Sequence, residues 1–353
     1  MDFLFDIPVV GLVIQLVLYI VEDFARSSTI ILALAAPIAL GALCGVMNER
    51  SGVVNIGIEG MMLASAFVGW FVASVVGQAA PSDPTFFFGA TPAIVIGVLA
   101  AIATGVVASA VHAWLSISVR ADQIISGTII NIAAIGVTSY LNRLLGQSLD
   151  GAGRFDAFEP PAFLVDLPVV GWIFEMFLDQ GPIAMSVILL VIMTQIMLFR
   201  SRWGLRTRAV GEHPKAADTV GVNVIRLRYK NVIIGGALAG LGGAYLTLEA
   251  TGTFQNGMTA GRGFIALAAV IFGRWNPVGA FIAALLFAGS DRLGMAISIR
   301  PPPDELGDLL AMVPNQFYAA LPYIITIIIL AGVVGRSIPP AAVGKPYEKE
   351  SSA

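Results

Sequence analysis

The sequence predicts an all-α polytopic membrane protein with about 8–10 transmembrane helices, some of them interrupted or re-entrant. Composition is the first reason: of 353 residues, 57% are hydrophobic and only 12% are charged, whereas a soluble domain carries roughly 25% charged residues. The second reason is that apolar runs of membrane-spanning length recur along the whole chain. The third is that basic residues gather in one polar stretch, residues 199–230.

The predicted spans follow from runs of about 20 apolar residues, the length of a helix that crosses the hydrocarbon. The first run, residues 3–21, is either a span or an interfacial helix, because Asp6 lies near its end. The other predicted spans are residues 29–47, 61–77, 93–116, 123–145, 182–199, 231–248, 263–288 and 317–334.

Charge placement orients these spans. Residues 199–230 hold a large excess of Arg and Lys, which is typical of a cytoplasmic loop, and the acidic residues 146–180 then form an extracytoplasmic loop. We therefore predict a single transmembrane domain over residues 1–335, with a cytoplasmic tail at 336–353. Counting crossings from the basic loop, the tail would end on the wrong side of the membrane if the run 263–288 were one continuous span. We therefore predict that its GRWNP sequence, residues 273–277, splits it into two short helices or two short spans.

A second interruption lies in the first half of the chain, where residues 52–60 mix glycines with apolar residues. Asn55 and Glu59 are four residues apart and would share a helix face. Interrupted apolar segments in both halves of a transporter point to a central substrate site. We expect Asn55 and Glu59 to line a substrate pathway.

The span 123–145 carries an unusual polar stripe. Gln123, Ser126 and Asn131 lie along it, and Gln123, Gly127, Asn131 and Thr138 fall on one broad face of the predicted helix. Such a stripe is expected on a helix that lines an aqueous path, although interhelical hydrogen bonds that only hold the bundle together would give the same pattern. Glu249, near a predicted span end, either faces the path or reaches the headgroups.

Several function classes lack the residues that they need. No G-x-x-x-x-G-K-[ST] sequence occurs, so the chain does not itself cradle ATP in a P-loop. With two histidines and one cysteine, Cys44, metal catalysis has few ligands; His112 is interpreted as an interfacial packing residue and Cys44 as a core residue. Membrane orientation explains the basic loop, so nucleic-acid binding is not expected.

Within the basic loop, the sequence predicts a short helix. Pro214 suits its first turn, Glu212 suits the positive end of its dipole, and Gly221 suits its termination. Ala216, Ala217 and Val220 would give it a small apolar face. A helix of two turns is not stable alone in water, so we expect it to dock on a soluble partner.

This loop resembles the cytoplasmic coupling loop of permeases of ABC importers, whose motif begins Glu-Ala-Ala and has a glycine a few residues later. Glu212, Ala216, Ala217 and Gly221 stand closest to that motif, although three residues separate the acid from the alanines. Over about residues 38–290 the chain looks like the simple-sugar and nucleoside branch of these permeases. The matching stretches are ERSGVVNIGIEGMML, RADQIISGTIINIAAIGVTSYL, RAVGEHPKAADTVGVNV, GGALAGLGGAYL and GRGFIALAAVIFGRWNPVGAFIAALLF.

The resemblance implies the partners and the mechanism. Two permease chains, usually paralogues, would form the pathway in a bacterial or archaeal plasma membrane, and an extracytoplasmic binding lipoprotein would deliver a nucleoside or a simple sugar. Separate ATPase subunits would bind ATP and move the coupling helix; this chain would need no cofactor. The alternatives are an ion-coupled secondary transporter, which would not need the long basic loop, and a membrane enzyme, for which we find no adequate catalytic cluster.

Overall fold

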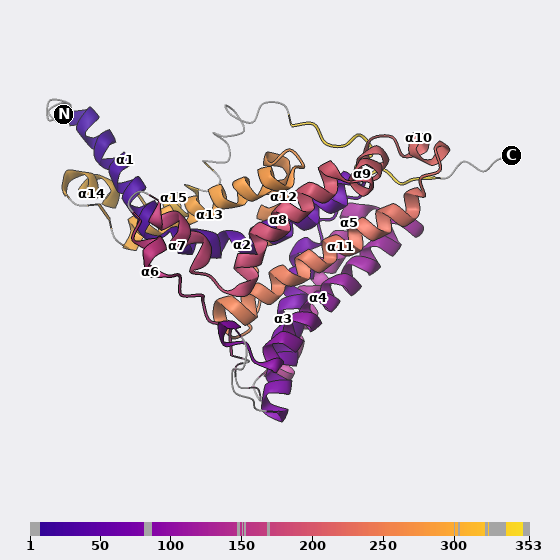
Figure 1. The fold of residues 1–353 in the computed structure, drawn as a ribbon, viewed down its shortest axis with the longest axis horizontal. Helices are drawn as coiled ribbons and strands as arrows, with labels where there is room; N and C mark the ends of the chain where they lie inside the picture. Colours follow the sequence, from indigo (N-terminus) through magenta and orange to yellow (C-terminus); the bar gives the residue numbers. More distant parts are fainter. Residues whose placement is uncertain are drawn as a thin grey trace. The chain divides into compact units, whose positions relative to one another are not determined.

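A computed structural model describes residues 8–80, 87–146, 149, 151, 153–167, 170–299, 301–302, 304–321, 324 and 337–348 (Figure 1). In these residues all regular secondary structure is helical, which confirms the predicted fold class. Seven helices there are long and apolar enough to cross a membrane. They are α2 (Ser28–Arg50), α3 (Ile58–Ala79), α4 with a π-helical extension (Pro92–Ser118), α5 (Gln123–Leu145), α8 (Pro182–Arg200), α11 with a π-helical extension (Val224–Thr251) and α13 (Pro277–Ile299).

The other helices are shorter or lie at the start of the chain. They are α1 (Pro8–Arg26), a 3-10 turn (Phe87–Gly89), α6 (Ala162–Val165), α7 (Gly171–Leu178), α9 (Arg202–Glu212), α10 (Pro214–Thr219), α12 (Arg262–Phe272), α14 (Asp304–Ala311) and α15 (Asn315–Ala319). The predicted last span, residues 317–334, lies largely outside the described residues.

The predicted span limits hold best where the apolar pattern is uninterrupted. Helix α5 has the predicted limits, residues 123–145. Helix α11 begins earlier than the predicted residue 231, because Asn223 caps it: the Arg226 N–H donates to Asn223 Oδ1 at 2.9 Å. The end of the basic loop is therefore helical.

The chain divides into two compact units. Unit 1 comprises residues 1–35, 159–180 and 285–336, and unit 2 comprises residues 36–158, 181–284 and 337–353. Residues 337–348 of the predicted tail thus belong to unit 2. Unit 2 holds all the residues that the sequence singled out for transport.

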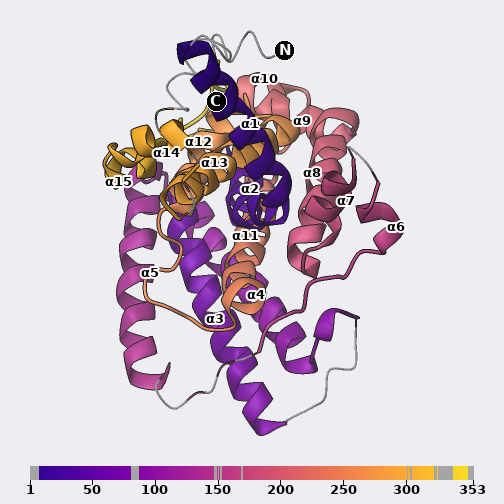
Figure 2. The same cartoon turned by 90° about the vertical axis from the view of Figure 1, so that its left-hand side faces the viewer.

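The core of unit 2 is a group of tightly packed helices, α3, α4 and α11, with α5 lying along α3 (Figure 2). Small residues permit this packing. At Gly105 of α4, a Cβ would lie 2.8 Å from the Gly240 backbone of α11, closer than two such atoms can approach. Because lipid tails are as apolar as the side chains, the hydrophobic effect does not drive helices together within a membrane. Close backbone approach and van der Waals contacts hold them together instead.

The predicted break after α12 is confirmed, but the second helix is not short. Helix α12 has 11 residues, about 16 Å of rise and too short to cross a bilayer. Helix α13 has 23 residues and is long enough to cross. The helix continues beyond residue 288, where the prediction ended the span, and it includes the polar residues Ser290, Asp291 and Arg292.

The break itself is an ordered turn. Arg274 and Trp275 both adopt left-handed backbone conformations, with φ of 53°. Arg50, the last residue of α2, donates hydrogen bonds to the carbonyl oxygens of Trp275 (2.7 Å) and Arg274 (3.2 Å). The Trp275 indole N–H donates to Glu49. Asn276 Oδ1 then accepts from the N–H groups at the start of α13.

Candidate transport site and coupling region

The irregular backbone between α2 and α3, residues 51–57, is held by side chains of other helices; we call it the broken segment. Gln123 Oε1 accepts from the Val54 N–H at 2.7 Å, and His112 Nε2 lies 2.9 Å from the Val54 carbonyl oxygen. Asn131 Nδ2 donates to the Ile56 carbonyl at 3.0 Å. Irregular backbone is tolerated within a membrane only where protein or water satisfies it, and here α4 and α5 provide the partners.

Asn131 also satisfies the start of α3. Its Oδ1 accepts from the Gly60 N–H at 2.7 Å, one of the N-terminal amides that have no partner within the helix. Asn131 lies two turns into α5 from Gln123, about 12 Å along the helix axis. The broken segment and the first turn of α3 therefore extend over roughly this length of α5.

Ser126 contacts the broken segment indirectly, through the ring of His112. The Ser126 hydroxyl lies 3.0 Å from His112 Nδ1. Because the Val54 carbonyl oxygen can only accept, His112 Nε2 carries a proton. The sequence interpretation of His112 as an interfacial residue is wrong: it is fully buried and joins α4, α5 and the broken segment. An ionisable residue inside an apolar span was the available signal.

Asn55 and Glu59 do not share a helix face as predicted, because α3 begins only at Ile58. Asn55 Oδ1 accepts from the Gly57 N–H at 3.0 Å within the broken segment. The Glu59 carboxylate accepts from the N–H groups of Gly261 (2.8 Å) and Gly263 (2.6 Å) at the start of α12. Glu59 thus caps another helix, where the positive end of the dipole favours a carboxylate.

All five residues predicted to line a pathway therefore gather around the broken segment. Asn55, Glu59, Gln123, Ser126 and Asn131 are each 6% exposed or less. Their polar groups bind this chain itself, except Gln123 Nε2, which has no partner in the described part of the chain. They form a polar layer inside an apolar bundle, and their place beside a substrate path stays a prediction.

Glu249 repeats the capping arrangement at a second place. Its carboxylate accepts from the N–H groups of Ile183 (2.6 Å) and Ala184 (3.0 Å) at the start of α8. The Glu249 side chain is 9% exposed. It therefore does not reach the headgroups as a free side chain, which was one of the two alternatives that the sequence left open.

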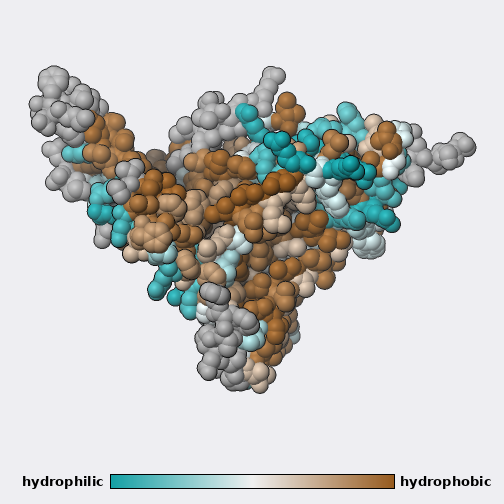
Figure 3. Space-filling model, viewed as in Figure 1, coloured by the Kyte–Doolittle hydropathy of each residue, from teal (hydrophilic) through white to brown (hydrophobic). Residues whose placement is uncertain are grey.

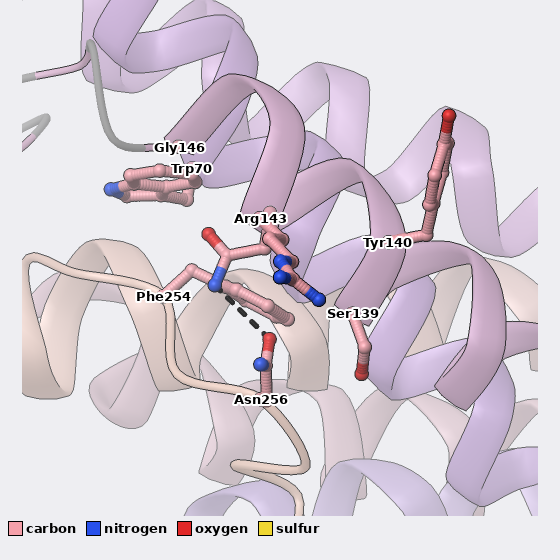
Figure 4. A pocket seen from close by; sticks show the side chains of 8 residues that line it. Trp70, Ser139, Tyr140, Arg143, Gly146, Phe254 and Asn256 are labelled. Atoms are coloured by element: carbon pink, nitrogen blue, oxygen red, sulfur yellow. Dashed lines mark hydrogen bonds between the residues drawn. The ribbon is translucent and has the colours of Figure 1, made fainter.

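A cavity of about 710 Å³ lies at the far end of α5 from Gln123 (Figure 4). Its lining includes Trp70 and Phe254, whose rings stack with centroids 6.1 Å apart. Asn142 Nδ2 donates to Asn256 Oδ1 at 3.0 Å on its wall. The sequence did not predict this cavity, because it forms only where the loop after α11 meets α3 and α5. Its volume is in the range of small-molecule sites.

The short helix predicted in the basic loop is present as α10, and its coupling role stays a prediction. Pro214 occupies its first position, and Gly221, with φ of +83°, follows its end. Ala217 is buried, whereas Ala216 and Val220 are exposed, so the predicted apolar face is divided between the two sides of the helix. Hydrophilic side chains surround α9 and α10 at this end of the unit (Figure 3).

Glu212 has a different contact from the one predicted. It is the last residue of α9, and its carboxylate accepts from the backbone N–H of Ala341 at 3.1 Å. The C-terminal residues 337–348 lie beside it, and its roles at the positive end of α10 and in coupling to an ATPase stay predictions. No set of three His, Cys, Asp or Glu side chains in the described ranges is placed to hold a metal ion.

Comparison with known proteins identifies the family. Residues 28–330 match the family described as the permease component of the branched-chain amino acid transport system. The chain belongs to this permease family. Its relatives are permease proteins of ABC transporters, so it is a multi-pass transport subunit of the ABC type and not an enzyme, as the sequence predicted.

Individual relatives cover the permease almost completely. The permease is 40% identical over 328 residues to the guanosine ABC transporter permease protein NupQ of Bacillus subtilis, covering 90% of this chain and 95% of the relative. It is 35% identical over 323 residues to a nucleoside ABC transporter permease protein of Lactococcus lactis, covering 89% and 94%. A Haloferax volcanii protein provisionally named as a glucose ABC transporter permease is 35% identical over 331 residues, covering 90% and 95%. No solved structure matches.

Proposed function

We propose that this permease imports nucleosides as part of an ATP-driven importer. The observation that carries the proposal is the 40% identity to a guanosine permease across 90% of the chain. The cavity at the far end of α5 is compatible with it, since aromatic rings and amide side chains are groups that stack on a base and hydrogen-bond to its edge or to ribose. A simple sugar is the second candidate, because a glucose-named relative matches over the same length.

The assembly we propose has a second permease, two ATPase subunits and an extracytoplasmic binding protein. The ATPase subunits would bind at α9 and α10, where the exposed side chains of Lys215, Ala216 and Val220 lie. The excess of Arg and Lys at this end supports its placement in the cytoplasm, and with it the placement of residues 337–353. ATP binding would then move α10.

The polar layer around the broken segment is our candidate for the closed part of the pathway. Asn55, Glu59, Gln123, Ser126 and Asn131 would become accessible when α3, α5 and α12 move apart. Polar groups inside a membrane bundle are costly unless they serve function or packing. Here the side chains of Gln123, Asn131 and Asn55 form hydrogen bonds with the irregular backbone of the broken segment. A continuous helix would satisfy its own backbone and would not need these side chains.

The test is transport in reconstituted vesicles that contain the permease with its partner subunits and enclosed ATP. We expect labelled guanosine to accumulate and unlabelled nucleosides, but not glucose, to compete. Accumulation of glucose instead would favour the sugar alternative. Uptake that persists with a hydrolysis-deficient ATPase and depends on an ion gradient would overturn the proposal in favour of a secondary transporter.

A further inference from the structure

The C-terminal residues 337–348 form a strap across one end of unit 2, with a turn at residues 341–344 (Figure 1). At its start, the Ser337 hydroxyl donates to the Ile271 carbonyl near the end of α12 at 2.8 Å. Further along, the Ala342 N–H donates to the Gly211 carbonyl of α9 at 2.8 Å. The Ala341 N–H donates to Glu212, as described above.

The next residues of the strap bind the broken segment. The Gly344 N–H donates to the Gly52 carbonyl at 3.3 Å. Arg228 of α11 joins the two: its Nε donates to the Ser51 carbonyl and an Nη donates to the Lys345 carbonyl, both at 3.1 Å. Arg228 is only 1% exposed. Two of its three guanidinium nitrogens are used in this way, and Nη2 has no partner in the described part of the chain. A buried arginine is costly unless its donors are used, so the two backbone contacts offset part of that cost and tie Arg228 to both segments.

The end of the strap packs against the predicted coupling helix. Tyr347 is buried in an apolar cluster with Ala217 of α10 and with Val210, Val224 and Leu227 of α9 and α11. Ala217 is the buried residue of α10. The buried side of α10 therefore packs against this apolar cluster. The strap contributes the ring of Tyr347 to the cluster.

These contacts are too close along the chain to move independently. Tyr347 is three residues from Gly344, and three residues of extended chain span at most about 10 Å. A displacement of α10 by a few ångströms that carried Tyr347 with it would therefore pull on Gly344 and Lys345. Those two residues are bonded to the broken segment directly and through Arg228.

We propose that the strap is a coupling element, with Tyr347 as its positioning residue on α10 and Arg228 as its link to the broken segment. This inference rests on the proposed function, because it requires that α10 be moved by an ATPase. It adds a route from α10 to the polar layer that runs through the C-terminus as well as through the covalent connection of α10 to α11.

The experiment compares two truncations of the permease in the full transporter. One ends after Pro339 and lacks most of the strap. The matched control ends after Glu348 and lacks only residues 349–353. The readouts are copurification with the ATPase, basal ATP hydrolysis, its stimulation by the loaded binding protein, and uptake.

We expect the control to match the intact chain in every readout. The strap truncation should keep the ATPase bound and hydrolysing, while stimulation and uptake fall by about tenfold or more, as expected when a coupling free energy is lost. Uptake and stimulation within about twofold of the control would overturn the proposal.

A point variant protects the test against misfolding of the truncated chain. Tyr347→Ala should reproduce the loss of stimulation with the ATPase still bound. Tyr347→Phe should retain more stimulation than Tyr347→Ala, because it keeps the ring in the cluster. If Tyr347→Ala instead releases the ATPase, the strap belongs to the docking surface and the proposal is wrong. These assays use the solute that the intact transporter imports. If the proposed import of nucleosides is wrong, the intact chain shows it. If the proposed role of the strap is wrong, only the variants show it.

Discussion

At the residue scale, two buried carboxylates serve as helix caps. Glu59 accepts from the amides of Gly261 and Gly263 at α12, and Glu249 accepts from those of Ile183 and Ala184 at α8. A carboxylate inside a span is costly, but it is stabilised when backbone N–H groups at a helix N-terminus surround it. These two residues tie each capped helix to the core of unit 2.

Replacement of Glu59 should reveal this capping role. Glu59→Ala leaves two buried N–H groups without an acceptor, at a cost of about 1–3 kcal/mol for each group, so the free energy of unfolding should fall. Glu59→Gln keeps one acceptor oxygen and should lose less. The measurement is thermal unfolding of the purified permease in detergent, with the exposed Glu22→Ala as control. Equal stability of Glu59→Ala and the control would contradict the assignment.

Two glycines allow the effect of close helix packing on stability to be distinguished from the effect of helix propensity. Gly105 faces α11 with no room for a Cβ, whereas a Cβ at Gly136 of α5 would have no neighbour within 4 Å. Gly105→Ala should destabilise the permease by about 1–3 kcal/mol through overpacking. Gly136→Ala should leave stability unchanged or slightly higher, since Ala is the better helix former. Thermal unfolding of both variants is the check, and similar losses in the two would show that the α4–α11 contact is looser than described.

At the element scale, the broken segment and the turn after α12 are both irregular and both satisfied by specific side chains. Sequence reasoning located each interruption from its glycines and prolines. It could not find the partners, because His112, Gln123 and Asn131 reach the broken segment from other helices. Only the packing of α4 and α5 brings them together.

The start of α13 offers a test at this scale. Asn276 Oδ1 accepts from the N–H groups of Val278 (3.0 Å) and Gly279 (3.1 Å). Asn276→Ala should lower the free energy of unfolding by about 0.5–2 kcal/mol, the usual cost of losing an N-cap. Asn276→Asp keeps the acceptor and should retain most of the stability. Denaturation of the two variants side by side decides, and a stable Asn276→Ala would argue against the cap.

At the scale of the whole molecule, the topology can be measured with cysteine labels. Cys44 is the only cysteine and is buried, so a Cys44→Ala chain provides a clean background. Val220→Cys lies at α10, and Ala157→Cys lies in the predicted extracytoplasmic loop; both positions are exposed. We expect an impermeant thiol reagent added to intact cells to label Ala157→Cys and to reach Val220→Cys only after permeabilisation. Labelling of both from the same side would refute the proposed orientation.

The sequence by itself determined the class of protein, the limits of α5, the existence of the break after α12 and the short helix between Pro214 and Gly221. These features follow from local physics: apolar length, charge bias, and the backbone preferences of Pro and Gly. The same reasoning shortened α13 and did not predict the contact of Glu212 with Ala341, because neighbouring residues along the chain do not reveal a partner from a distant segment.

Only the tertiary structure decided what the polar residues bind. Glu59 caps α12, Arg228 joins α11 to the broken segment and the strap, and Tyr347 completes the cluster beneath α10. The physical reason is that a buried polar group is stabilised by whichever donor or acceptor the packing brings within hydrogen-bond distance. In this permease those partners lie up to roughly 200 residues away along the chain.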